Sequence, residues 1–384
     1  MKKIKQMGRV KQTLICLAVT LLVGLVYFYF ELPAINFHSP EFYTFVFILC
    51  GVYCVTAVFT ARLGMEAEER MNFFPVGLRG FFAMMKRHCM IPFILCLALV
   101  VFYLGGSLFS SVILRAGSYT KLLTVEDGDF VTDVEEISFD QIPMLDKDSA
   151  SKLGDRKLGE LSDMVSQFEV SDQYNQINYN GHPVRVTMLE YGDLIKWFTN
   201  RKNGIPAYLI IDMVTQNVDV VRLPQGQGIK YSPSEHFGRY LMRHLRFNYP
   251  TFMFDTPMFE INDQGEPYWI CPKLEKTIGL VGGTDINGAV LVNAITGESQ
   301  YYEEVPTWVD RLYSAELIMQ QYDYHGQYQN GFLNSIFGQK GVTVTTSGYN
   351  YIAMNDDVYV YTGVTSVGGD QSNVGFILTN QRTK

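Results

Sequence analysis

The sequence predicts three membrane-spanning helices followed by an α+β region of helices and antiparallel sheets. Long uncharged apolar runs are confined to residues 1–114. Residues 115–384 instead carry the turn residues and the alternating apolar pattern that are typical of strands. The net charge also changes at this point, from +5 over residues 1–114 to −13 over residues 115–384. A basic, apolar head and an acidic, polar body are expected to face different solvents.

Three apolar runs are long enough to cross a membrane as helices. Residues 13–30, 42–61 and 90–114 contain no Asp, Glu, Lys or Arg. A helix crosses the hydrocarbon in roughly 20 residues, and an unpaired backbone group is too costly there. Buried helices of a soluble protein would be shorter or would carry a polar face. We therefore expect residues 1–114 to form a membrane anchor with three spans.

The basic residues of the anchor predict its orientation. They lie before the first run and between the second and third runs, whereas residues 31–41 contain none: Lys2, Lys3, Lys5, Arg9, Lys11, Arg62, Arg70, Arg79, Lys86 and Arg87. Because basic flanks remain in the cytoplasm, we expect a multi-pass cell-membrane protein with a cytoplasmic N-terminus and an extracytoplasmic body. A cleaved signal is the alternative for the first run, but the run has anchor length and no convincing small-x-small site follows it.

Charge and cysteine usage argue against several classes of function. No run has a charge in its middle, which argues against transport by this chain alone. The acidic body lacks the clustered Lys and Arg that bind phosphates, so nucleic acid is not an expected partner. The body holds only Cys271 and must fold without an internal disulfide. The lipid bilayer is the one partner that composition indicates.

The body repeats one pattern three times, after an extracytoplasmic connector at 115–147. We expect repeat 1 at 148–231, repeat 2 at 232–307 and repeat 3 at 308–384. Each repeat begins with a helix, at about 148–165, 232–247 and 308–322, judged from apolar spacing. A glycine turn then leads into an alternating segment, at Gly181, Gly265 and Gly348. An apolar strand follows and ends in an Asn/Asp-x-x-Thr corner, at 212–215, 293–296 and 380–383.

The corner has a physical basis, because Asn and Asp side chains accept local backbone hydrogen bonds in turns. After the first two corners, apolar and aromatic residues at 218–221 and 301–302 predict return strands and hence hairpins. A helix followed by such a meander is expected to pack across one face of the sheet. Repeat 3 stops just after its corner. We therefore expect repeat 3 to be incomplete and the natural protein to be longer.

Repeat 2 carries the clearest family signature. Residues 263–270 read Asp-Gln-Gly-Glu-Pro-Tyr-Trp-Ile, and residues 288–298 read Gly-Ala-Val-Leu-Val-Asn-Ala-Ile-Thr-Gly-Glu. These segments resemble the PepSY family of extracytoplasmic modules, which has a Val-x-Val-Asp-Ala-x-Thr-Gly-Glu hairpin. Asn293 stands in the place of the family's Asp, and the gap between the motifs is longer. The resemblance implies PepSY- or cystatin-like units with a regulatory or peptide-binding role and no catalysis. The whole chain is also similar to multi-pass membrane proteins of Gram-positive, clostridia-like bacteria.

Motifs for catalysis are missing from the sequence. There is no His-Glu-x-x-His pair, Gly-x-Ser-x-Gly elbow, phosphate loop or dinucleotide glycine run. We therefore expect no catalytic residues, no metal and no cofactor. Residues 355–357 with Asp370 form an acidic cluster for which we expect an ordinary turn rather than a calcium site.

One stripe of residues is a candidate ligand site. His236, Arg239, Arg243 and Arg246 would share one face of the helix expected at 232–247. In an acidic body, such a stripe is suited to a carboxylate or phosphate group of a cell-wall polymer or a peptide. The alternative is a solvated helix face that is paired with its own acidic neighbours.

Three hypotheses follow for the function. The first is a membrane-anchored, non-catalytic binding, scaffold or regulatory protein of the cell envelope, whose partner is a cell-wall polymer, a peptide or another envelope protein. The second is an envelope hydrolase, which needs two carboxylates, or Ser with His, in one pocket. The third is an accessory subunit of a membrane complex that binds through its three helices.

Overall fold

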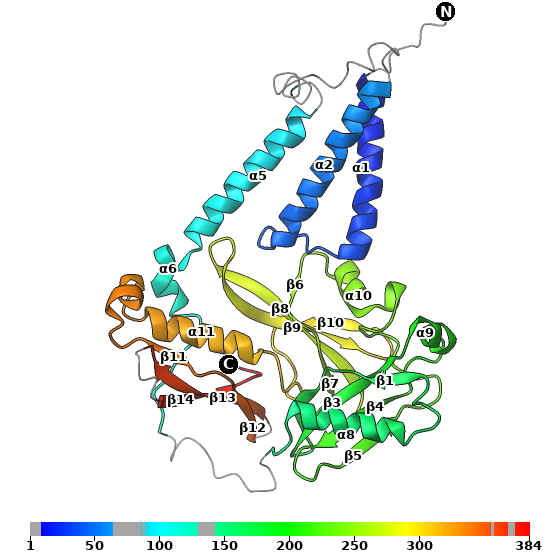
Figure 1. Cartoon of the computed structure of the whole chain (residues 1–384), viewed down its shortest axis with the longest axis vertical. Helices are drawn as coiled ribbons and strands as arrows, with labels where there is room; N and C mark the ends of the chain where they lie inside the picture. The colour runs from blue at the N-terminus through cyan, green and yellow to red at the C-terminus, as the bar shows by residue number, and fades with distance from the viewer. Residues whose placement is uncertain (1–8, 64–85, 87–88, 130–142, 355–356, 368–372) are drawn as a thin grey trace, which may run out of the picture. The chain divides into compact units, whose positions relative to one another are not determined.

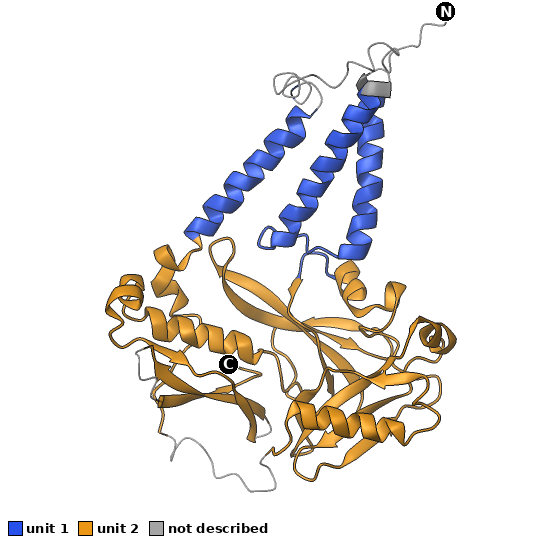
Figure 2. Cartoon of the chain, in the orientation of Figure 1, with its two compact units in different colours: residues 1–109, 249–252 blue, residues 110–248, 253–384 orange. Residues whose placement is uncertain are grey.

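The computed structural model describes residues 9–63, 86, 89–129, 143–354, 357–367 and 373–384. The chain divides into two compact units, coloured separately in Figure 2. The first unit consists of residues 1–109 and 249–252, and the second of residues 110–248 and 253–384. Each unit is described by itself below.

The described residues of the first unit form three long apolar helices: α1 (Arg9–Glu31), α2 (Pro40–Leu63) and α5 (Met90–Phe109). All three are long and apolar enough to span a membrane, which confirms the three helices predicted from the apolar runs. α1 and α2 lie close together at Gly24, where an added Cβ would come within 2.8 Å of the Leu49 side chain. Residues 249–252 belong to this unit because the Ile35 N–H donates to the Pro250 carbonyl at 2.8 Å.

The third helix is shorter than predicted. α5 ends at Phe109 rather than at residue 114, and a separate helix, α6 (Val112–Tyr119), begins in the second unit. Ser110 interrupts the run. Its Oγ accepts hydrogen bonds from the N–H groups of Leu280 at 2.7 Å and Val281 at 3.1 Å, and a serine bonded in this way competes with helix continuation. The tail of the apolar run is thus part of the α+β unit.

The second unit contains three antiparallel sheets (Figure 1). Sheet 1 comprises β1 (Phe168–Val170), β2 (Asn175–Tyr179), β3 (His182–Tyr191), β4 (Ala207–Asp212) and β5 (Val218–Arg222). Sheet 2 comprises β6 (Met253–Phe254), β7 (Met258–Ile261), β8 (Pro267–Ile278), β9 (Gly282–Asn293) and β10 (Ser299–Tyr302). Sheet 3 comprises β11 (Thr343–Thr345), β12 (Asn350–Met354), β13 (Asp357–Ser366) and β14 (Asn373–Asn380).

The three sheets share one order of pairing. In each, two short strands pair with successive stretches of a long strand, β3, β8 or β13, which also pairs with the strand that follows it. Sheets 1 and 2 then add β5 and β10, which confirms the two predicted return strands. The whole region is therefore an arrangement of helices and antiparallel sheets.

The predicted corners are confirmed by the same hydrogen bonds in all three repeats. The side-chain oxygen of Asp212 accepts from the N–H groups two and three residues later, at 2.9 and 2.7 Å. The corresponding distances are 3.0 and 3.0 Å at Asn293 and 2.8 and 3.1 Å at Asn380. These bonds are local, so the Asn/Asp-x-x-Thr pattern alone is sufficient to predict them.

All three predicted glycine turns have a positive φ and lead into a strand, but the third is not equivalent to the other two. Gly181 and Gly265 each precede the long strand of their sheet, with φ of +78° and +77°. Gly348 instead precedes β12, one strand too early. The second residue of each corner shows the true equivalence, because its N–H donates to the carbonyl of Pro183, Pro267 or Val358, at 3.1, 3.0 and 2.9 Å. Val358 therefore occupies the position of the two prolines.

The helices differ most from expectation. α8 is Lys147–Gly159 and ends before the predicted residue 165, and α11 is Ala315–Tyr328 rather than 308–322. Residues 308–313 form no helix because Val309 and Leu312 pack into the core against sheet 2. The helix predicted at 232–247 is a 3₁₀ turn, η2 (Phe237–Arg239), followed by α10 (Leu241–Asn248). An unpredicted helix, α9 (Leu194–Asn200), connects β3 and β4.

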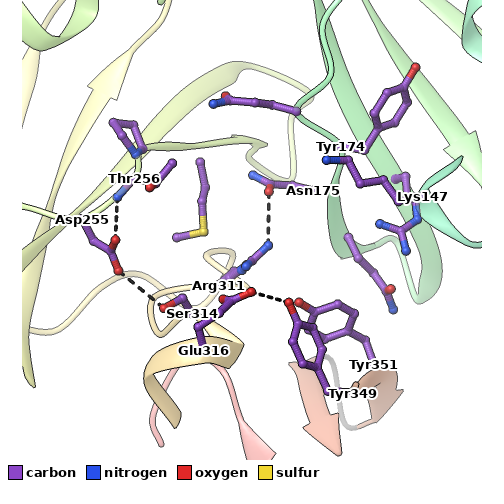
Figure 3. A pocket seen from close by; sticks show the side chains of 15 residues that line it. Lys147, Tyr174, Asn175, Asp255, Thr256, Arg311, Ser314, Glu316, Tyr349 and Tyr351 are labelled. Carbon is purple, nitrogen blue, oxygen red and sulfur yellow. Dashed lines mark hydrogen bonds between the residues drawn. The ribbon is translucent and has the colours of Figure 1, made fainter. Parts of the chain in front are cut away.

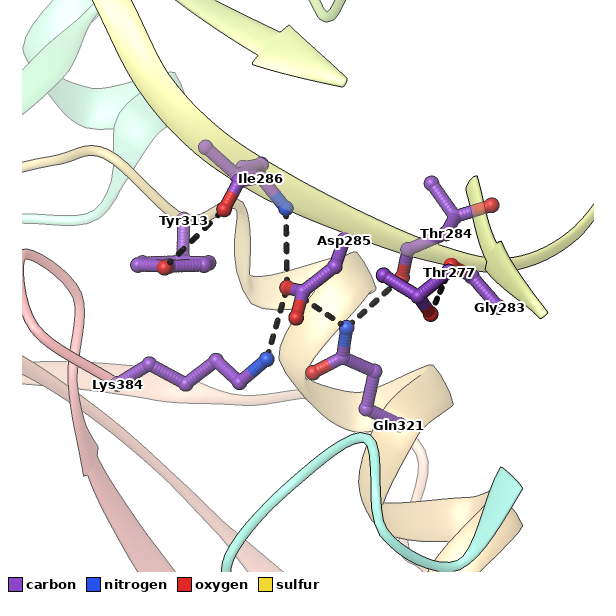
Figure 4. Close-up of polar contacts among 8 residues, drawn as sticks. All are labelled: Thr277, Gly283, Thr284, Asp285, Ile286, Tyr313, Gln321 and Lys384. Atoms are coloured by element: carbon purple, nitrogen blue, oxygen red, sulfur yellow. Dashed lines mark hydrogen bonds and ion pairs between the residues drawn. The ribbon is translucent and has the colours of Figure 1, made fainter. Parts of the chain in front are cut away.

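Apolar packing covers each sheet, and polar contacts join repeat 3 to repeat 2. α8 packs on sheet 1 through Ala150, and α11 packs on sheet 3 through Ile318. Figure 4 shows Asp285 of β9 between Gln321 of α11 and Lys384. Asp285 accepts from Gln321 Nε2 at 3.2 Å and pairs with Lys384 Nζ at 2.8 Å. These bonds attach the third sheet and its helix to the second sheet.

Candidate functional site: a polar pocket between the repeats

A pocket of about 590 Å³ lies where the three repeats meet in the second unit. Repeat 1 contributes residues 173–176, at the start of β2, and Arg185 of β3. Repeat 2 contributes residues 255–257 between β6 and β7 and Met258, the first residue of β7. Repeat 3 contributes residues around the start of α11 and residues of β12, and Lys147 opens α8 at the rim (Figure 3). This volume is within the range of about 300–1,000 Å³ that is common for ligand pockets.

Three basic residues line this pocket in a body that is acidic overall: Lys147, Arg185 and Arg311. Arg185 is only 8% exposed, because β3 is covered along nearly its whole length. Burial lowers the pKa of Arg185, whereas Tyr351 and Asp146 raise it and the nearby charge of Arg311 lowers it. The Arg311 guanidinium lies 5.8 Å from the centre of the Tyr351 ring. Three basic side chains thus line a pocket that also contains two carboxylates, Asp255 and Glu316.

Two carboxylates, Asp255 and Glu316, also line the pocket but bond to different partners. Asp255 accepts from the Thr256 N–H at 2.8 Å and from Ser314 Oγ at 3.5 Å. Glu316 accepts from the Tyr349 hydroxyl (Figure 3). None of the lining residues is His or Cys, so a Ser–His pair is not among the residues that line this pocket.

Behind the pocket, hydrogen bonds connect all three repeats. Asn175 Nδ2 donates to the Phe259 carbonyl at 2.8 Å, which joins repeat 1 to repeat 2. The Asn178 N–H donates to Asp310 Oδ2 at 2.8 Å, and the Asp310 N–H donates to Glu260 Oε2 at 3.1 Å. Such buried polar networks hold their members in one arrangement when they are satisfied. These hydrogen bonds therefore hold together the segments that lie behind the pocket.

Glu260 in this network is fully buried, and burial raises its pKa to about 8, although Arg311 and the backbone N–H groups act in the opposite direction. The folded protein therefore holds a proton that the unfolded chain loses near pH 4.5. This proton stabilises the folded state fully below pH 4.5. As the pH rises from 4.5 to about 8, its contribution to the free energy of unfolding is lost, at about 1.4 kcal/mol per pH unit.

We expect the Glu260→Gln variant to lose this pH dependence, because the amide keeps the shape and cannot ionise. The measurement is the melting temperature of the full chain in detergent from pH 4.5 to 8.5, followed by circular dichroism. The wild-type value should fall more steeply with pH than that of the variant. Parallel curves would show that Glu260 is ionised in the fold.

The predicted stripe of His236, Arg239, Arg243 and Arg246 does not lie on one helix. Tyr240, with ψ of 118°, interrupts the helical backbone between Arg239 and Arg243. Arg239 donates to the Arg201 carbonyl at 2.6 Å, and Arg243 donates to the Phe237 carbonyl at 2.8 Å. His236 packs edge-on against Trp197, and Arg246 is buried with its guanidinium 5.8 Å from the Phe254 ring centre. The four side chains make separate contacts within the fold.

Asp357 of the acidic cluster bonds to Arg382, whereas residues 355, 356 and 370 lie outside the described residues. In the described part of the chain, no group of three His, Cys, Asp or Glu residues is placed to hold a metal ion. The pocket residues were not predicted from the sequence. A signal was present at Arg185, a charged residue between Val184 and Val186 in a covered strand, and at Arg311 between Val309 and Leu312.

Comparisons with known proteins show no relative of this chain. No protein-family model matches it, and neither the curated proteins nor the solved structures include a match.

Proposed function

We propose that the protein is a membrane-anchored, non-catalytic binding protein of the bacterial cell envelope, and that its ligand occupies the pocket between the repeats. The observation that carries this proposal is the pocket itself, whose polar and charged lining comes from all three repeats. A site of this composition and volume is suited to binding a polar ligand. Regulation or scaffolding would follow if occupancy changes how the three repeats hold together.

Membrane attachment is supported by the three apolar helices. The proposed orientation, with the N-terminus in the cytoplasm and the α+β unit outside, is supported by the basic residues that flank the first and third helices. The PepSY-like segments of repeat 2 are consistent with a binding role outside the cell. In this proposal the anchor keeps the α+β unit in the cell envelope, where envelope components are available.

The test is ligand capture by the full chain in lipid nanodiscs. We expect the wild type to retain a component of a bacterial envelope extract, detected by mass spectrometry. Thr256→Trp places a large side chain at an exposed position of the pocket lining and should abolish retention. Thr199→Trp, at an exposed position of α9, is the matched control and should retain the component. Equal retention by all three proteins, or none by the wild type, would refute the proposed site.

A further inference from the structure

The two guanidinium groups of the pocket form no ion pair within the described part of the chain, although Asp146 interacts with Arg185 and Glu260 with Arg311 at longer range. Arg185 Nε donates to the Leu145 carbonyl at 3.3 Å, and Arg311 Nη1 donates to Asn175 Oδ1 at 3.5 Å. No carboxylate oxygen of a described residue lies within 4.0 Å of either group. Cations in a buried setting are costly without an opposite charge. The arrangement therefore favours a ligand that brings an anion to Arg185 and Arg311.

Further hydrogen-bond donors in the same wall lack acceptors. Gln176 is 4% exposed, and its Nε2 has no partner, although the residue lines the pocket. Arg311 Nε is likewise buried without a partner. A carboxylate accepts several hydrogen bonds at its two oxygens and fits the fork of a guanidinium. Gln176 Nε2 and Arg311 Nε are themselves closed to solvent, so a ligand carboxylate would reach them only after a side-chain movement.

The two carboxylates of the pocket favour a positively charged group on the same ligand, in addition to its anionic group. Asp255 and Lys147 lie on opposite sides of the pocket, with Glu316 between them in the view (Figure 3). A doubly charged phosphate would be repelled by Asp255 and Glu316, whereas an ammonium group would be attracted. The rings of Tyr349 and Tyr351, 5.5 Å apart, add apolar surface for the body of a ligand.

We infer that the pocket binds a short peptide in its zwitterionic form. Its C-terminal carboxylate contacts Arg185 and Arg311, and its N-terminal ammonium group faces Asp255 and Glu316. A volume of about 590 Å³ exceeds the need of a single amino acid and suits a ligand of a few residues. This inference rests on the proposed binding function and adds the chemical class of the ligand.

The experiment uses the full chain in nanodiscs and three synthetic tripeptide libraries. One library has free ends, one is amidated at the C-terminus, and one is acetylated at the N-terminus. Retained peptides are counted by mass spectrometry after filtration. We expect the free-ended library to be retained at least about tenfold more than the amidated one, since the amide cannot pair with the two guanidinium groups. Acetylation should lower retention less, because Glu316 is exposed to solvent whereas Arg185 is buried.

Variants of the pocket residues test which side chains recognise each end of the peptide. Arg185→Gln and Arg311→Gln should each remove the preference for a free carboxylate, and Asp255→Asn should remove the preference for a free amino group. Arg222→Gln is the matched control, because Arg222 is an exposed arginine outside the pocket. If a glutamine variant fails to fold, the lysine variant is measured. It keeps the charge without the fork and should show a reduced preference.

Equal retention of the free-ended and amidated libraries, or an unchanged preference in the arginine variants, would overturn the inference. Retention of an envelope component by the wild type but of none of the peptide libraries would also overturn it, while leaving the proposed binding function in place. Failure of both experiments would overturn the binding function itself.

Discussion

Replacement of Trp269 by alanine is expected to lower the free energy of unfolding of the α+β unit by about 3–5 kcal/mol. Trp269 is the largest of the fully buried side chains of this unit and has no exposed surface. Its indole N–H donates to the Tyr231 carbonyl at 2.8 Å. Its ring packs edge-on against the Phe259 ring, with 5.4 Å between the ring centres. The Phe259 ring in turn packs against that of Tyr208 in sheet 1, with 6.0 Å between the ring centres. The alanine variant therefore removes packing that connects sheets 1 and 2.

The measurement is denaturant unfolding of the full chain in detergent, followed by circular dichroism. Ile195→Ala is the matched control, because Ile195 in α9 is 73% exposed and its truncation should change the unfolding free energy by less than about 0.5 kcal/mol. A loss at Trp269 no larger than the loss at Ile195 would contradict the packing described here.

Replacement of Arg382 by alanine should lower the unfolding free energy by about 3 kcal/mol, at the low end of the values found when one partner of a buried pair is removed. Arg382 donates from Nε and Nη2 to the two oxygens of Asp357, both at 2.7 Å. The side chains are 20% and 10% exposed. Asp357 is the first residue of β13, and Arg382 lies in the third corner, just after β14. The pair therefore joins the start of β13 to the corner that follows β14. The variant leaves the Asp357 carboxylate with only Asn380 as a side-chain donor.

Arg222→Ala provides the comparison, because Arg222 forms a similar two-pronged pair with Asp163, at 2.7 and 3.2 Å. That pair is 51% and 58% exposed, and exposed pairs contribute about 0–1 kcal/mol. Both variants are followed by the same denaturant unfolding. Equal losses for the two variants would show that burial does not strengthen the Arg382–Asp357 pair.

The features that the sequence predicted correctly depend on neighbours in the chain. The apolar spans need only an uninterrupted run, so α1, α2 and α5 were found, although the third run was predicted to continue to residue 114. The corners at Asp212, Asn293 and Asn380 need only a side-chain oxygen and the next two or three N–H groups. The helices were less predictable because apolar spacing also occurs in loops that pack into a core. Residues 308–313 are such a loop, and α11 begins only after Ser314, whose Oγ caps it.

The candidate site could not be predicted because its residues are distant in the sequence. Lys147, Arg185, Asp255, Arg311 and Tyr351 come from all three repeats, and their proximity depends on how the sheets pack. The predicted arginine stripe assumed one helix, but the non-helical backbone of Tyr240 separates its members. Local patterns in this chain therefore determined the three spans and the repeated corner. The tertiary structure alone decided which charged groups meet in the pocket, since long-range packing rather than spacing brings them within reach of one another.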